Sequence, residues 1–180
     1  MNNKETDKEY EKCIYFLAEK LRRCKNNTNT LIHSIRVGLN IQKDGLDTNM
    51  VKAGFLHDIF EDTNILESEL KNQYNNKIVE LILNTTADYS VGNEEEVLVN
   101  MYARCLNYGD DALLLKCYDI EDKMKYYKYS IDKKVVHIHN YKYKLFLDIS
   151  KDRIFNYKIW KKMKNEYEEC KKTWKSNGLI

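Results

Sequence analysis

The sequence contains no proline and only six glycines among its 180 residues. Proline breaks or kinks helices, and a glycine inside a helix destabilises it. Long stretches in which apolar and polar residues alternate, as they do in half-buried strands, are also lacking. These absences predict an all-α fold.

Long apolar runs are absent as well. None approaches the roughly 20 residues of a membrane-spanning helix, and the N-terminus, MNNKETDKEYEK, lacks the apolar region of a signal peptide. The five cysteines are odd in number, widely scattered and without a CxxC pair. This pattern argues against a disulfide framework or a cysteine zinc site, and it favours a reducing compartment. We therefore expect a cytoplasmic protein with no membrane partner.

The chain also lacks an excess of charge of one sign, since 30 basic and 28 acidic residues leave a net charge of +2. Lysine and tyrosine alternate in KMKYYKYS and HNYKYKLF, which could suit stacking on a nucleic-acid strand. Amphipathic helices that pack tyrosines inward explain these stretches more simply. We expect no nucleic-acid partner, and the sequence leaves the oligomeric state open.

An apolar fraction of 43% and 14 tyrosines indicate a folded chain. Turn residues separate segments in which apolar residues recur at helical spacing. The expected helices span residues 7–23, 31–41, 49–62, 65–73, 77–86, 94–107, 111–127, 132–148 and 152–175. No linker or repeat divides them, so we expect a single domain over residues 1–180.

The run AGFLHDIFEDT places His57, Asp58, Glu61 and Asp62 within an otherwise apolar segment. A buried carboxylate must be neutralised or paired, because burying an isolated charge is costly. On one continuous helix, Glu61 follows His57 by four positions and Asp62 follows Asp58 by four, so the four side chains would share a face. Such groups can bind an ion, orient water and transfer protons.

Two further ligand-type residues occur in apolar surroundings, His33 in LIHSIRVGL and Asp119 in LLLKCYDIEDK. Each has a simpler interpretation, His33 as a hydrogen-bonded core histidine and Asp119 as an ion-pair partner of Lys116 or Lys123. Their combination with His57 and Asp58 favours a divalent metal, which accepts imidazole and carboxylate ligands together. His137 and His139 point apart on a helix and are expected at the surface.

In order along the chain, His33, His57-Asp58 and Asp119 resemble the H…HD…D signature of HD-domain metal-dependent phosphohydrolases. HDIFEDT closely resembles the HDxxEDT segment of the hydrolase domain of RelA/SpoT proteins and of small stand-alone alarmone hydrolases. LLLKCYDIEDKM is similar to that group's helix reading roughly LVKLADRLHNM. The resemblance covers residues 7–172 and implies a helical HD-domain bundle.

The resemblance implies a single Mn²⁺ held by His33, His57, Asp58 and Asp119, although Fe²⁺, Co²⁺ and Zn²⁺ stay open. Glu61 and Asp62 would be the catalytic acid–base pair. The implied reaction is attack of a metal-activated water on the 3′-pyrophosphate of the nucleotide (p)ppGpp, which gives GDP or GTP and belongs to the stringent response.

The chain departs from the family pattern at several positions. Ser34 replaces a proline after the first histidine, and Lys123 replaces an asparagine near the ribose. The family's base-contacting arginine has three candidates, which are Arg22, Arg23 and Lys25, and Lys116 is a candidate phosphate contact. These departures leave open another HD enzyme, such as a deoxynucleotide phosphatase or cyclic-nucleotide phosphodiesterase, or an inactive nucleotide-binding regulator.

Overall fold

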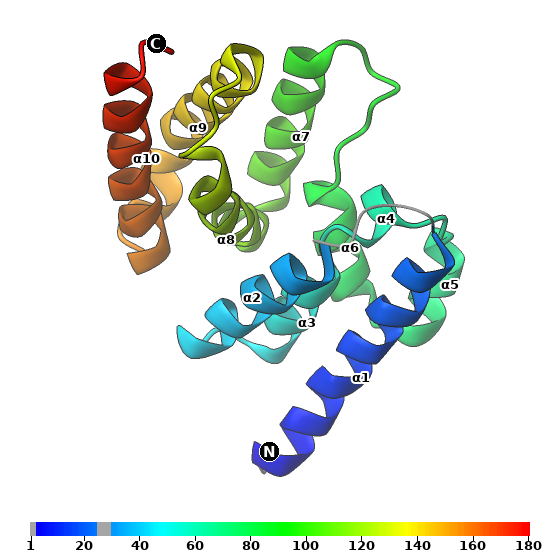
Figure 1. Cartoon of the computed structure of the whole chain (residues 1–180). Helices are drawn as coiled ribbons and strands as arrows, with labels where there is room; N and C mark the ends of the chain where they lie inside the picture. Colours follow the sequence, from blue (N-terminus) through cyan, green and yellow to red (C-terminus); the bar gives the residue numbers. More distant parts are fainter. Residues whose placement is uncertain (1–2, 25–29) are drawn as a thin grey trace. The chain divides into compact units, whose positions relative to one another are not determined.

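The computed structural model of the chain describes residues 3–24 and 30–180 (Figure 1). Over these residues the chain forms ten α-helices and no strand, which confirms the predicted all-α class. The helices are α1 Asn3–Arg23, α2 Thr30–Lys43, α3 Thr48–Leu56, α4 Ile59–Asp62, α5 Glu67–Gln73, α6 Asn76–Thr85, α7 Glu94–Tyr108, α8 Asp110–Tyr127, α9 Lys133–Ile154 and α10 Lys158–Ser176. Within these ranges, no helix is both long and apolar enough to cross a membrane.

The helices form two compact units, one ending at Tyr89 and one beginning at Ser90. In the first unit, α2 and α3 lie side by side (Figure 1). They approach closely because glycines face each other: a Cβ atom at Gly54 would lie 3.0 Å from Cα of Gly38 and 2.6 Å from Cδ1 of Ile41. This contact sets the spacing between the helix that carries His33 and the helix that leads to His57.

Helix α1 packs against α3 through its buried stripe, with Tyr10 contacting Phe55 at a ring-centroid distance of 5.7 Å. Near its C-terminal end, Phe16 meets Tyr74 edge to face at 5.6 Å, and Lys20 forms an ion pair with Glu69. Aromatic packing therefore joins α1 to the helices that follow.

The expected helix over residues 49–62 is interrupted, which corrects the sequence prediction. Helix α3 ends at Leu56, and α4 starts at Ile59. Asp58, between them, has φ −94° and ψ 6°, and its carbonyl accepts the N–H groups of Glu61 and Asp62 at 3.0 and 2.9 Å. The bend means that His57 and Glu61 do not share one continuous helical face.

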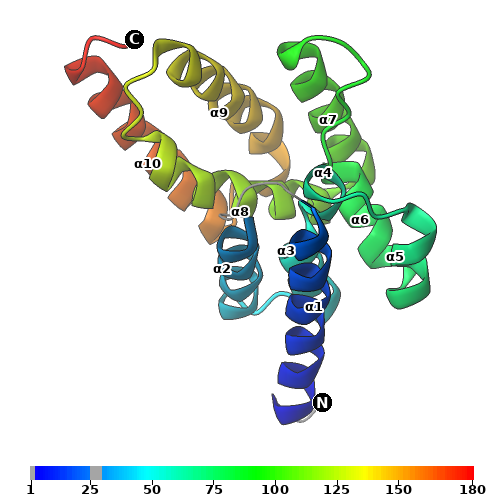
Figure 2. The same ribbon diagram turned by 45° about the vertical axis from the view of Figure 1, so that its right-hand side comes forward.

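In the second unit, α8 contacts α7, α9 and α10 (Figure 2). Its residues are buried on almost every side, as expected for a helix at the centre of a bundle. Trp174 and Tyr143 are fully buried and stack at 6.2 Å between α9 and α10. Lys162 of α10 pairs with the buried Glu121 of α8 at 2.9 Å.

Helix α9 continues to Ile154, beyond the predicted end at residue 148, and the break before α10 lies at residues 155–157. Residues 149–151, which separated two predicted helices, are helical, and Ser150 among them is fully buried. Its hydroxyl donates to the Phe146 carbonyl at 2.6 Å and accepts the indole N–H of Trp160 at 2.9 Å. Ser150 thus links α9 to α10.

Candidate metal centre

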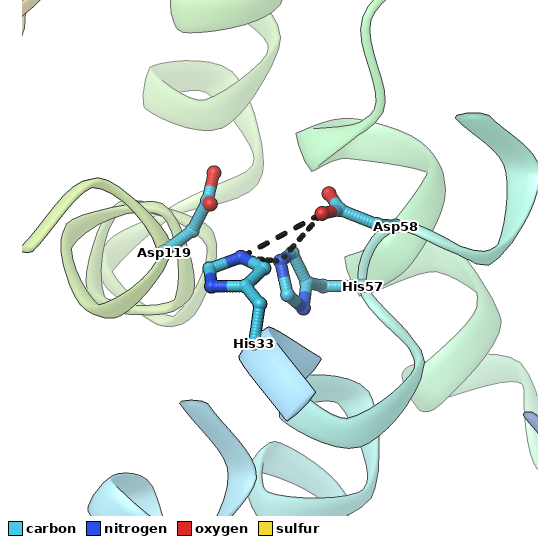
Figure 3. A group of neighbouring side chains, drawn as sticks. All are labelled: His33, His57, Asp58 and Asp119. Carbon is cyan, nitrogen blue, oxygen red and sulfur yellow. Dashed lines mark hydrogen bonds and ion pairs between the residues drawn. The ribbon is translucent and has the colours of Figure 1, made fainter. Parts of the chain in front are cut away.

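His33 lies in the second turn of α2, on the face that packs toward α3, and its side chain is only 8% exposed. Its Nε2 atom lies 3.1 Å from Nε2 of His57, and the two rings meet edge to face with centroids 5.0 Å apart (Figure 3). Two histidines 24 positions apart in the sequence thus direct the same ring nitrogen to one point.

The tautomer of His57 follows from its second contact. Its Nδ1 lies 2.9 Å from the carbonyl oxygen of Gly54, one turn earlier in α3. A carbonyl can only accept, so Nδ1 carries the proton and donates it, and Nε2 of the neutral ring keeps its lone pair. Histidines that bind metals are commonly fixed in this way by a bond from the other ring nitrogen.

Asp58 brings a carboxylate to the same point. Its Oδ2 lies 3.2 Å from Nε2 of His57 and 3.6 Å from Nε2 of His33, and its side chain is 8% exposed (Figure 3). The bend between α3 and α4 allows this approach, because it lets adjacent residues in the sequence direct their side chains to one place.

The spacing of these three atoms fits a metal ion. Ligands about 2.1 Å from a common ion lie about 3.0 Å apart at octahedral angles and about 3.4 Å apart at tetrahedral angles. The observed separations are 3.1, 3.2 and 3.6 Å. Two imidazole nitrogens and one carboxylate are also the donor set that divalent transition metals accept. A buried His/Asp cluster able to bind a metal is therefore present in the first unit.

Asp119 belongs to the second unit, near the middle of α8, and is fully buried. Its two oxygens are held by lysines, Lys123 at 2.8 Å and Lys116 at 2.9 Å. Lys116 is itself only 3% exposed. Burial raises the pKa of Tyr102 and Tyr143 well above the usual phenol value, and the nearby Asp119 carboxylate raises both further.

These contacts match the ion-pair interpretation of Asp119, and they place two of the predicted substrate-binding residues, Lys116 and Lys123, on one carboxylate. Both lysines lie within about one helical turn of Asp119 on α8.

Glu61 and Asp62 occupy the end of α4, and both are half-buried. The Glu61 Oε1 accepts the backbone N–H of Ala87 at 2.7 Å, which ties α4 to the segment that follows α6. Glu61 therefore has a positional role in addition to the acid–base role predicted for it. The sequence could not show this bond, because Ala87 contributes only a backbone group.

The predicted base contacts lie at the end of α1. Arg22 and Arg23 are exposed, and Arg23 pairs with Glu19 one turn earlier at 2.5 Å. Lys25 lies outside the described residues.

The predicted surface position of His139 is wrong. Its ring stacks on Tyr127 with a centroid distance of 3.5 Å, and burial, with Lys142 and Lys123, lowers its pKa to about 3. His137 is exposed, as expected. The pattern HIH indicated two opposite directions correctly, but it could not show which direction faced the core.

Sequence comparisons find relatives with a common description, although no family model matches the chain. A guanosine-3′,5′-bis(diphosphate) 3′-pyrophosphohydrolase of Aquifex aeolicus is 27% identical over 121 residues, covering 65% of this chain and 17% of the relative. One from Borreliella burgdorferi is 36% identical over 64 residues, covering 36% and 10%. A probable enzyme of this kind from Mycoplasma pneumoniae is 34% identical over 67 residues, covering 37% and 9%. The chain thus spans less than a fifth of each relative's length.

A solved structure shares the fold. It is described as a metazoan orthologue of SpoT that hydrolyses ppGpp, and it superposes with a TM-score of 0.69 over 95% of this chain and 96% of its own. The sequence identity is 16%, so this likeness concerns the fold. Together the comparisons confirm the resemblance to RelA/SpoT-type hydrolases that the sequence motifs indicated.

Proposed function

We propose that this chain is a metal-dependent phosphohydrolase that removes the 3′-pyrophosphate of guanosine alarmones and converts (p)ppGpp to GDP or GTP. The observation that carries the proposal is the convergence of His33, His57 and Asp58, with the His57 tautomer set by Gly54. The names of the three relatives and the described activity of the solved neighbour support this substrate.

The proposed ion is Mn²⁺, with His33, His57 and Asp58 as ligands and Asp119 as the fourth. When bound, a divalent ion lowers the pKa of a coordinated water and offsets phosphate charge. The protein's own contribution begins with orientation. The Gly54 carbonyl fixes which nitrogen of His57 would face a bound ion, and the bend at Asp58 brings the carboxylate beside both rings.

Glu61 and Asp62 are proposed to move protons during attack on the phosphorus and departure of the nucleotide 3′-oxygen. The bond from Ala87 fixes Glu61 in one orientation and leaves its second oxygen to act on water. Lys116 is proposed to supply the positive charge that a pyrophosphate group needs, and Lys123 lies at the position expected to meet the ribose. Arg22, Arg23 and Lys25 are the proposed base contacts. A cytoplasmic location and a role in the stringent response belong to the same proposal.

A second candidate function rests on Lys123. An ammonium group 2.8 Å from Asp119, where the resembled family has asparagine, changes the charge at the position expected to meet the ribose. The fully buried Ser34, where the family has proline, is a further difference. These two residues favour a related HD phosphohydrolase that acts on a deoxynucleotide or cyclic nucleotide.

A substrate panel tests the proposal. Protein loaded with Mn²⁺ is assayed against ppGpp, pppGpp, 3′-pyrophosphorylated adenosine nucleotides, deoxynucleoside monophosphates and cyclic dinucleotides, with products separated by ion-exchange chromatography. We expect GDP and pyrophosphate from ppGpp, and loss of turnover in Asp58→Asn. Preferential cleavage of a deoxynucleotide or cyclic nucleotide would establish the second candidate, and binding of ppGpp without any turnover would indicate an inactive regulator.

A further inference from the structure

A cavity of about 260 Å³ opens between α9 and α10 in the second unit. Its wall on α9 is formed by Lys144, Leu147, Asp148 and Lys151, which lie on one stripe of the helix because they follow one another at intervals of three, one and three positions. Leu147 and Asp148 form the centre of this wall, with an ammonium group toward each end.

The wall on α10 is aromatic. It consists of Trp160, Lys164, Tyr167 and Glu168, again on one helical stripe. Trp160 donates its indole N–H to Ser150 at 2.9 Å, so the ring is held in one orientation. The Tyr167 hydroxyl donates to Asn140 Oδ1 at 2.7 Å, which fixes the second ring. Lys164 Nζ lies 5.7 Å from the Trp160 ring centroid, at cation–π distance.

The lysines of the cavity have no carboxylate partner among the described residues. Among the described residues, Lys144, Lys151 and Lys164 form no ion pair with an N–O distance of 4.0 Å or less, although Asp148 and Glu168 lie at suitable helical spacing. Glu168 is instead held by Lys171 at 2.7 Å. Three ammonium groups therefore surround a cavity whose remaining carboxylate is Asp148.

We propose that this cavity binds a nucleotide, with the base against the half-buried Trp160 and the phosphates at the lysines. The buried Tyr167 forms the floor of the cavity beside it. Flat aromatic faces suit any base, since stacking does not depend on the base's identity. Drug-sized ligands occupy cavities of about 300–1,000 Å³, so a volume of about 260 Å³ fits the base while the phosphates reach the rim. The site shares no residue with the proposed metal centre, and it is a binding site rather than a second catalytic one.

Intrinsic fluorescence tests this directly, because the chain has two tryptophans and only Trp160 lines the cavity. Trp174 is fully buried and serves as an internal reference. The full chain is titrated with GDP in the presence of EDTA, with excitation at the red edge of indole absorption. We expect saturable quenching that Trp160→Phe abolishes, while calorimetry still detects GDP binding to that variant because phenylalanine keeps an aromatic face.

Matched variants show whether the quenching arises from GDP bound in this cavity. Lys151→Met and Lys164→Met should each weaken GDP binding about tenfold. Lys161→Met, an exposed lysine of α10 outside the cavity, should not. Asp58→Asn should leave the quenching intact, and guanosine or pyrophosphate alone should bind at least about tenfold more weakly than GDP. The proposal is overturned if millimolar GDP gives no saturable quenching, or if Asp58→Asn removes the quenching. It is also overturned if the Lys151→Met and Lys164→Met variants bind GDP as Lys161→Met does. Binding of pyrophosphate as tight as that of GDP would contradict it as well.

Discussion

Two single backbone groups orient ionisable side chains of the candidate site. The Gly54 carbonyl selects the tautomer of His57, and the Ala87 N–H holds Glu61. Neither group is visible as a functional residue in the sequence, since glycine and alanine contribute no side-chain chemistry here. For Gly54 a signal did exist, because it precedes His57 by three positions on a helix, where a ring nitrogen can reach a carbonyl. A substitution of a side chain held in this way should therefore remove its charge without removing the hydrogen bond that orients it.

Glu61 offers that separation. Glu61→Gln keeps an oxygen that can accept the Ala87 N–H but removes the charge, so the fold and the metal content should be unchanged while kcat on ppGpp falls about 10²- to 10⁴-fold. Glu61→Ala loses the bond as well and should also loosen the segment around Ala87. Turnover is measured with Mn²⁺-loaded protein, and metal content by elemental analysis. Wild-type turnover in Glu61→Gln would show that this carboxylate only positions the chain.

His139 makes stability depend on pH. Burial lowers its pKa from 6.5 to about 3, so below pH 6.5 the unfolded chain binds a proton that the folded chain does not. The stability is fully present above pH 6.5 and is lost as the pH falls toward 3, by about 1.4 kcal/mol per pH unit at most. His139→Phe keeps an aromatic ring stacked on Tyr127. The free energy of unfolding of this variant, measured with urea, should therefore fall less steeply between pH 6.5 and 3.

The exposed His137 is the matched control, and His137→Phe should leave the pH profile of the wild type unchanged. An equal slope in wild type and His139→Phe would mean that His139 is protonated in the folded protein. Carboxylates also titrate between pH 6.5 and 3, and they contribute equally to the pH dependence of every variant. The test therefore compares the free energy of unfolding between variants.

At the scale of helices, most elements could be predicted because apolar periodicity and turn residues mark them directly. The two errors concern where a helix ends. HDIFEDT continues the helical spacing, yet the chain bends at Asp58, and α9 runs through residues 149–151, which separated two predicted helices. Periodicity records which side chains are apolar. It does not record the backbone angles of a single residue such as Asp58, and the site geometry depends on those angles.

The α2–α3 contact gives a prediction at this scale. Gly54→Ala gains about 1 kcal/mol of helix propensity, but its Cβ would lie 3.0 Å from the Gly38 Cα and 2.6 Å from Ile41 Cδ1. Overpacking against a backbone atom costs about 1–3 kcal/mol, so the net effect should be destabilising. Metal affinity should fall too, because moving α2 away from α3 separates His33 from His57.

Ile41→Val tests the cause, because it removes the Cδ1 atom and leaves the backbone contact. The double variant Ile41→Val, Gly54→Ala should recover part of the stability that Gly54→Ala loses, as measured by urea unfolding in a double-mutant cycle. Simple addition of the two single effects would contradict the close-packing explanation.

At the scale of the whole chain, the four predicted metal ligands come from both compact units, three from the first and Asp119 from the second. The order of the motifs along the sequence is what predicts these four residues as ligands. It could not show that Lys116 and Lys123 hold Asp119, because lysines at three and four positions from an aspartate are common on helix surfaces. Because Asp119 belongs to the second unit, its proposed role as the fourth ligand predicts that Mn²⁺ affects both units.

Hydrogen exchange tests this prediction. If Asp119 is the fourth ligand, Mn²⁺ should protect amides in both the α3–α4 bend and the middle of α8, and Mn²⁺ at about 100 times its Kd should stabilise the chain by about 2.7 kcal/mol. Asp119→Asn should then weaken Mn²⁺ binding and abolish protection in α8. Asp122→Asn is the matched control, since Asp122 is an equally buried carboxylate on the same helix. Protection confined to the first unit, with Mn²⁺ affinity unchanged in Asp119→Asn, would mean that Asp119 serves its two lysines and that three residues hold the ion.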